Sequence, residues 1–111
     1  MRLKISDIKA LQKGLEESPI CPPQYQVLLF GSRVDDSKKG GDIDLLMVVD
    51  DSFVEALTGT RHHLATAFKK YIDDQKLDIT LIGQKQKIIK FQQDPFYLSI
   101  KNSLVFLFGR N

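Results

Sequence analysis

The first part of the chain carries a helical pattern of apolar residues. Ile8, Leu11 and Leu15 recur at the spacing of one helical face. We expect Ser6 to cap the N-terminus of this helix, because a serine oxygen can accept a hydrogen bond from a free backbone N–H. The helix should end before Pro19, since proline does not continue a helix.

Two apolar segments then predict strands. Residues 27–30 are all apolar and are followed by Gly31 and Ser32, as expected of a buried strand that ends at a turn. Residues 42–49 predict a second strand. The polar, glycine-containing stretch 33–41 between them predicts a loop or one short helical turn.

A long helical pattern and a third strand follow. The pattern covers residues 53–72, and we expect Gly59 to divide it into two helices, because glycine weakens a helix interior. Residues 77–82 alternate between polar and apolar and predict the third strand. The apolar positions of the helical pattern are Phe53, Leu57, Leu64, Phe68 and Ile72.

The last part of the chain predicts two short helices and a final strand. Ile88 and Phe91 indicate one helix, and Asp94 followed by Pro95 is typical of the start of another. Residues 104–108 are apolar and predict the fourth strand. We expect the aromatic residues of the predicted helices to lie in the core, namely Phe53, Phe68, Phe91 and Phe96.

These elements predict one α/β (α+β) domain that spans residues 1–111. Four strands separated by about four helices indicate a small sheet covered by helices, and no internal linker divides the chain. A length of 111 residues with 42% hydrophobic and 27% charged residues is sufficient for a single core.

The apolar runs, the cysteine content and the net charge predict a cytoplasmic protein and do not alter the predicted fold. The longest apolar run, residues 45–49, is far shorter than a membrane-spanning helix, and no apolar segment follows the charged N-terminus, so we expect neither a membrane association nor a secretory signal. The single cysteine, Cys21, agrees with a cytoplasmic location. A net charge of +2 is too small to imply nucleic-acid binding.

Two aspartates give the chain its candidate chemistry. Asp42 and Asp44 are two apart on a predicted strand, so their side chains point to the same face and converge on one site. Carboxylates held this close repel each other, and Mg²⁺, which prefers hard oxygen ligands, would relieve the repulsion. Gly31 allows the backbone to approach a phosphate closely, while Ser32 adds a hydroxyl donor and Arg33 a positive charge.

A third carboxylate extends the site. Asp78 lies on the third predicted strand and shares its face with Thr80. If the second and third strands pair, Asp78 can reach the same metal ions and help to deprotonate an attacking hydroxyl.

The pattern Gly31-Ser32, nine residues, Asp42-Ile43-Asp44, then a distant Asp78 between apolar residues resembles the nucleotidyltransferase superfamily that includes DNA polymerase β. It is most similar to the minimal group, some of whose members are paired with HEPN-domain proteins. The resemblance covers nearly the whole chain and implies the nucleotidyltransferase fold, with a small mixed sheet.

The resemblance also implies an activity and its ligands. Family members transfer a nucleoside monophosphate from a nucleoside triphosphate, ATP being the first candidate, to a hydroxyl acceptor and release pyrophosphate. They use two Mg²⁺ ions, which Asp42 and Asp44 would both bind and of which Asp78 would bind the catalytic one. Gly31 and Ser32 would hold the triphosphate.

The sequence does not identify the acceptor. A HEPN-type partner protein is one candidate, a nucleic acid is another, and the basic residues Lys85, Lys87 and Lys101 are expected at the rim of the site. The alternative function is a non-catalytic Mg-nucleotide-binding module, or an antitoxin-like protein that neutralises a HEPN-type partner.

Other polar residues have simpler interpretations. His62 and His63 are adjacent on a predicted helix and therefore point in different directions, so we expect solvent-exposed residues and not a metal chelate. Arg61 is expected on the surface, with a contact to the nucleotide as its alternative. Asp50 and Asp51 are expected as charges at a helix end.

Overall fold

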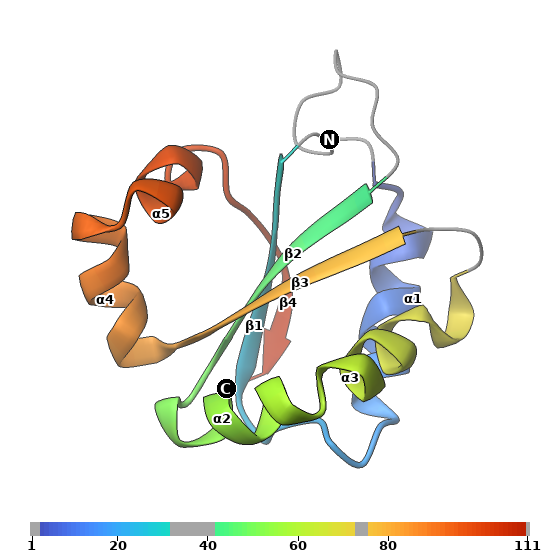
Figure 1. Ribbon diagram of the computed structural model, residues 1–111. Helices are drawn as coiled ribbons and strands as arrows, with labels where there is room; N and C mark the ends of the chain where they lie inside the picture. The colour runs from blue at the N-terminus through green and yellow to red at the C-terminus, as the bar shows by residue number, and fades with distance from the viewer. Residues whose placement is uncertain (1–2, 32–41, 73–75, 111) are drawn as a thin grey trace.

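A computed structural model describes residues 3–31, 42–72 and 76–110. They form five α-helices, one short 3-10 helix and four strands, in the order shown in Figure 1. The elements are α1 (Ile5–Glu16), β1 (Tyr25–Phe30), β2 (Asp42–Val49), α2 (Asp51–Gly59), α3 (Arg61–Phe68), η2 (Lys69–Tyr71), β3 (Lys76–Gly83), α4 (Gln84–Gln93), α5 (Pro95–Ile100) and β4 (Val105–Arg110).

The four strands form one mixed sheet in the order β3-β2-β1-β4. β1 pairs antiparallel with both β2 and β4, and β2 pairs in parallel with β3. A parallel pair needs a crossover connection, which α2, α3 and η2 supply between β2 and β3. The expected α/β class and the small mixed sheet of four strands are confirmed.

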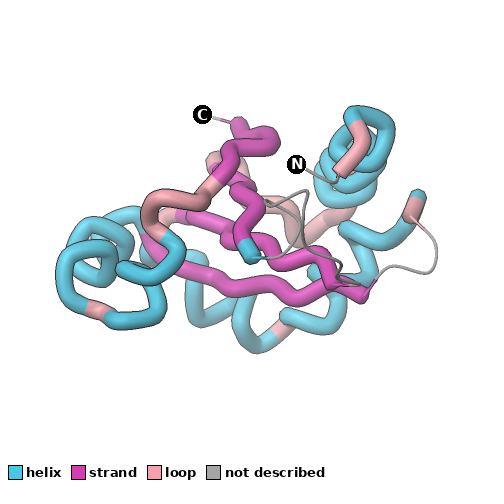
Figure 2. The backbone as a smooth tube through the Cα atoms, turned by 90° about the horizontal axis from the view of Figure 1, so that it is seen from above, coloured by secondary structure: helices cyan, strands magenta, loops and turns pink. Residues whose placement is uncertain are grey.

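Helices cover both faces of the sheet. α1, α2 and α3 pack on one face, where Leu11, Leu64 and Phe68 join the buried residues of the strands. α4 and α5 lie on the other face, over a smaller core that includes Leu46 and Ile100. Figure 2 shows the strands between these two groups of helices.

The start of the first helix differs from the expectation. α1 begins at Ile5, so Ser6 lies inside the first turn and is not the cap. The backbone N–H of Lys4 donates to the carboxylate of Asp7 at 3.3 Å, and this bond fixes the helix start ahead of the serine.

Two strands also differ slightly in extent from the prediction. β1 begins two residues earlier than predicted because Tyr25 and Gln26 pair with both β2 and β4. β4 runs to Arg110, and its register against β1 shifts between Val27 and Leu28. The two helices predicted in residues 53–72 are confirmed, with Gly59 at their boundary.

No helix in the described ranges is long and apolar enough to cross a bilayer.

Candidate functional site

β2 places Asp42 and Asp44 on the same face of the sheet. The alternation of the strand buries Ile43, at 1% exposure, and Leu45, at 0%, under α1 and α3 on the opposite face. Asp42 and Asp44 are both only partly buried. The apolar neighbours therefore fix the direction in which the two carboxylates point, as the sequence predicted.

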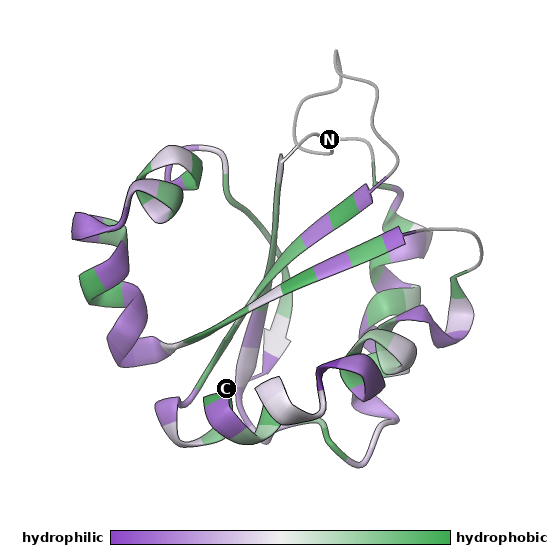
Figure 3. Cartoon of the chain, in the orientation of Figure 1, coloured by the Kyte–Doolittle hydropathy of each residue, from purple (hydrophilic) through white to green (hydrophobic). Residues whose placement is uncertain are grey.

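The pairing of β2 with β3 brings in the third aspartate. Asp44 is the register partner of Asp78, and Asp42 is the partner of Lys76. Side chains in register on parallel strands point to the same face, with the strands about 4.8 Å apart. Figure 3 shows polar bands side by side at the corresponding ends of β2 and β3.

The electrostatics of Asp44 reflect this crowding. Partial burial, followed by the negative charges of Asp78 and Asp42, raises the pKa of the Asp44 carboxyl above its ordinary value. An isolated surface aspartate would not experience this repulsion. The arrangement is therefore one that a bound cation would stabilise.

Gly31 lies directly against Asp44. Its φ angle of +81° is in the left-handed region that favours glycine, and a Cβ at this position would collide with the Asp44 carboxylate. The glycine therefore allows the end of β1 to approach the aspartates. The two other predicted phosphate-binding residues, Ser32 and Arg33, lie outside the described residues.

The aspartates match part of a magnesium coordination shell. No group of three or more His, Cys, Asp or Glu side chains in residues 3–31, 42–72 and 76–110 is arranged to hold a metal ion by itself. Magnesium is, however, usually held by one or two carboxylates together with substrate phosphates and water. The hard oxygens of Asp42 and Asp44 fit the protein's share of such a shell, and a nucleotide would supply the remainder.

A cavity borders Asp78 on the outer side of β3. It has a volume of about 420 Å³ and is lined by Arg61, His62, Ala65, Leu77, Asp78 and Ile79. The guanidinium of Arg61 donates a hydrogen bond to the carbonyl of Ile79, so this arginine ties α3 to the edge strand next to Asp78. The surface role expected for Arg61 thus includes a contact that holds β3.

The expectations for the other polar residues have mixed outcomes. His62 and His63 are exposed, as predicted, but their ring centroids lie 3.9 Å apart, so the expectation that they point in different directions is wrong. Asp50 caps α2 by accepting a hydrogen bond from the N–H of Ser52 at 3.0 Å, and Asp51 accepts bonds from the first N–H groups of α4, so both are helix-end charges as expected.

The expected position of two lysines is wrong. Asp78 is the third residue of β3, whereas Lys85 and Lys87 lie in α4, beyond the opposite end of the strand. They cannot border Asp78, because a strand advances about 3.3 Å with each residue. The third lysine, Lys101, does not lie in α4 but directly follows α5.

Two aromatic residues near the aspartates were not predicted as part of the site. Phe30 is the register partner of Asp44 on β1. The ring of Phe96, on α5, packs edge-to-face on Phe30 with centroids 5.7 Å apart, and Phe96 is 43% exposed. Its predicted core position is therefore wrong, as is that of Phe53, which is 37% exposed.

The chain matches no known protein-family model, and no curated protein is significantly similar to it. The function must therefore be argued from the residues of the site.

Proposed function

We propose that the protein is a Mg²⁺-dependent nucleotidyltransferase that transfers a nucleoside monophosphate, AMP from ATP in the first instance, to a hydroxyl acceptor. The observation that carries the proposal is the register of β2 and β3, which sets Asp78 opposite Asp44 with Asp42 on the same face. Three carboxylates from two strands are costly for stability, since like charges opposite each other repel. A site for a cation and a nucleotide explains why they are there.

The three aspartates have different proposed roles, which follow from their positions in the sheet. Asp42 and Asp44, on the inner strand and next to Gly31, would hold two Mg²⁺ ions and through them the triphosphate. When bound, Mg²⁺ supplies charge neutralisation at the transferred phosphoryl group. Asp78, on the edge strand and exposed, is the carboxylate that an acceptor can reach.

The reaction then proceeds as a single displacement. The acceptor hydroxyl loses its proton to the Asp78 carboxylate, and its oxygen forms a bond to the α-phosphorus of the nucleotide. The bond from that phosphorus to the oxygen bridging to the β-phosphate breaks, and pyrophosphate leaves with the electron pair.

The sheet is also consistent with the nucleotidyltransferase fold. An antiparallel hairpin of β1 and β2 carries Gly31 and the first two aspartates, and a crossover through α2 and α3 returns β3 in parallel with the third. This order accounts for the long spacing between Asp44 and Asp78 in the sequence.

Two exposed isoleucines on α4 favour a protein as the acceptor. Ile88 and Ile89 of α4 are 65% and 56% exposed, which is unusual for large apolar side chains and favours contact with another protein. The proposal assigns this surface to the docking of a HEPN-type partner that also carries the acceptor hydroxyl. The same observation favours the second candidate, a non-catalytic nucleotide-binding or antitoxin-like module, because neutralising a partner needs such a contact too.

One experiment separates the two functions. The protein is incubated with ATP labelled at the α-phosphate and Mg²⁺, with and without the product of a neighbouring gene, and both pyrophosphate and labelled acceptor are measured. We expect label transfer that is lost in Asp44→Asn and kept in Glu55→Gln, an exposed acid of α2. Tight binding of Mg-ATP without transfer to any acceptor would favour the non-catalytic module.

A further inference from the structure

A pair of aromatic residues connects α5 to the strand beside the candidate aspartates. Phe30 is the register partner of Asp44, and Cβ atoms of such partners lie about 5 Å apart. Phe96 packs on Phe30 with an interplanar angle of 83° and a centroid distance of 5.7 Å. Phe30 therefore links the Phe96 ring to Asp44, with one side chain between the ring and the aspartate.

The Phe96 ring is held in a fixed orientation. Tyr97 also meets it edge-to-face, at 5.1 Å and 82°, so two neighbouring rings restrict its rotation. At the start of α5, the N–H of Phe96 donates to the Asp94 carboxylate at 2.9 Å, which fixes the backbone. A ring that is already ordered loses little conformational entropy when a ligand binds.

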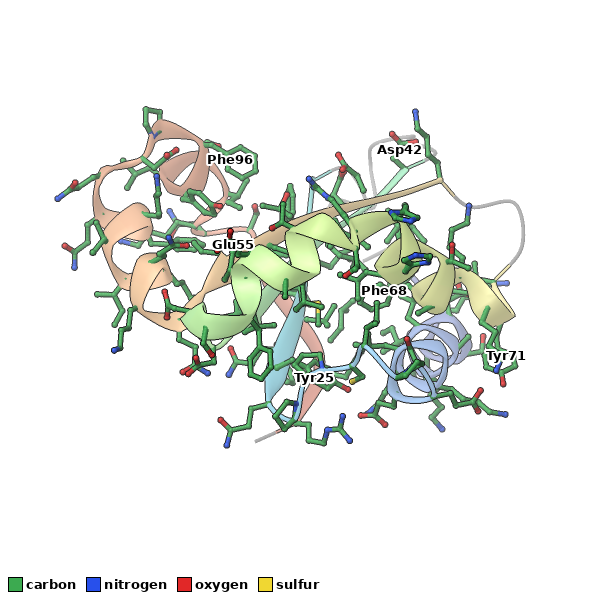
Figure 4. The ribbon with its side chains drawn as sticks, turned by 60° about the horizontal axis from the view of Figure 1, so that its bottom comes forward. Tyr25, Asp42, Glu55, Phe68, Tyr71 and Phe96 are labelled. Atoms are coloured by element: carbon green, nitrogen blue, oxygen red, sulfur yellow. The ribbon has the colours of Figure 1, made fainter. Side chains whose placement is uncertain are left out.

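Despite these contacts, Phe96 remains 43% exposed. Nearly half of this ordered aromatic residue is therefore accessible to a ligand. Figure 4 shows Phe96 and Asp42 on the same side of the sheet, with Phe68 on the other side. The Phe96 ring and the carboxylates therefore lie on the same face of the sheet.

We propose that the exposed ring of Phe96 is the stacking surface for the base of the nucleoside triphosphate whose phosphates are held at Asp42 and Asp44. The inference rests on the proposed function and adds the base-binding residue. Every nucleobase has a flat π-face, so stacking on Phe96 contributes affinity with little discrimination between bases. A purine, with its larger surface, gains the most.

The test compares a ligand that has a base with one that does not. Dissociation constants for Mg-ATP and for Mg-tripolyphosphate are measured by calorimetry on the wild type, Phe96→Ala, Phe96→Tyr and Leu98→Ala. Leu98 is a matched control, since it is on the same helix and is 44% exposed. Thermal unfolding of each variant verifies that it is folded.

We expect Phe96→Ala to weaken ATP about 5- to 150-fold, the range typical of a lost base–aromatic stack, and to leave tripolyphosphate unchanged. Phe96→Tyr should restore ATP affinity, and Leu98→Ala should leave both ligands unaffected. If Phe96→Ala binds ATP as the wild type does, or loses both ligands equally, the stacking role is wrong although the proposed function stands. A wild-type protein that binds neither ligand overturns both.

Discussion

The carboxylate of Asp44 occupies the space that a Cβ of Gly31 would need. The contact joins the residue that directly follows β1 to Asp44, which is close to both Asp42 and Asp78. The position of Asp44 thus depends on the absence of a side chain at residue 31.

We predict that Gly31→Ala impairs nucleotide binding more than it impairs stability. A non-glycine residue at φ +81° costs about 1–3 kcal/mol, and the added methyl would turn the Asp44 carboxylate away from its site. Calorimetric titration with Mg-ATP should show at least a tenfold loss of affinity, while urea unfolding shows a folded protein.

The matched control is Gly59→Ala. Gly59 ends α2, and a Cβ there meets no atom within 4 Å. This substitution should leave binding unchanged and raise stability by about 0.4–1 kcal/mol, because alanine restricts the unfolded chain. Equal losses of binding in both variants would show that Gly31 has no special relation to the site.

A second prediction concerns Asp44 itself. Without Mg²⁺, Asp44→Asn should make the protein more stable by about 0.2–1 kcal/mol, since it removes a charge that is partly buried and repelled by Asp78 and Asp42. With Mg-ATP at about 100 times its dissociation constant, the wild type should gain about 2.7 kcal/mol, and the variant should gain almost nothing.

Urea unfolding with EDTA, and again with Mg-ATP, measures both effects. Glu55→Gln serves as a control for the loss of one negative charge elsewhere. A variant that is less stable than the wild type in EDTA, yet stabilised equally by Mg-ATP, would assign Asp44 a structural role and contradict the metal site.

The third prediction separates binding from turnover at Asp78. Asp78→Asn should leave the affinity for Mg-ATP within a few fold, because Asp42 and Asp44 remain. It should lower transfer by a factor of about 10² or more, the scale of a lost general base. Single-turnover transfer of labelled nucleotide measures the second effect, and undiminished transfer would exclude a catalytic role for this residue.

The sequence was sufficient to predict that Asp42 and Asp44 share one face of their strand. Asp42 and Asp44 lie on a strand whose apolar alternation fixes which way each side chain points, so local periodicity was sufficient. The register of Asp78 with Asp44 could not be predicted from the sequence. Strand pairing depends on the path of the whole crossover between β2 and β3 and not on the local pattern of residues.

The aromatic neighbours could not be predicted from the sequence for a related reason. Phe96 is far from Asp44 in the chain, and helical periodicity only indicates that an aromatic residue is apolar, not how much of its ring is covered. The predicted N-cap of α1 was also wrong. The choice between Ser6 and Lys4 as cap depended on a single hydrogen bond, which the N–H of Lys4 donates to Asp7.

The last prediction concerns the acid sensitivity of the fold, away from the aspartates. Glu17, the C-cap residue of α1, accepts hydrogen bonds from Lys70 at 2.7 Å and from Tyr71 at 2.5 Å, so it joins α1 to η2. The hydrogen bond from Lys70, followed by that from Tyr71, lowers the pKa of Glu17 below its ordinary value. The folded state therefore favours the ionised carboxylate more than the unfolded chain does.

A lowered folded-state pKa stabilises the protein above the unfolded pKa of glutamate, about 4.3, and the stabilisation disappears as the pH falls through the folded value. Glu17→Gln should therefore be less stable than the wild type at neutral pH, by a small amount because the pair is exposed to solvent. The difference should shrink steadily once the pH falls below about 4.3. Urea unfolding of both proteins across this range measures the difference. If the difference between wild type and Glu17→Gln stays constant from neutral to acid pH, the contacts of Glu17 with Lys70 and Tyr71 do not depend on its charge.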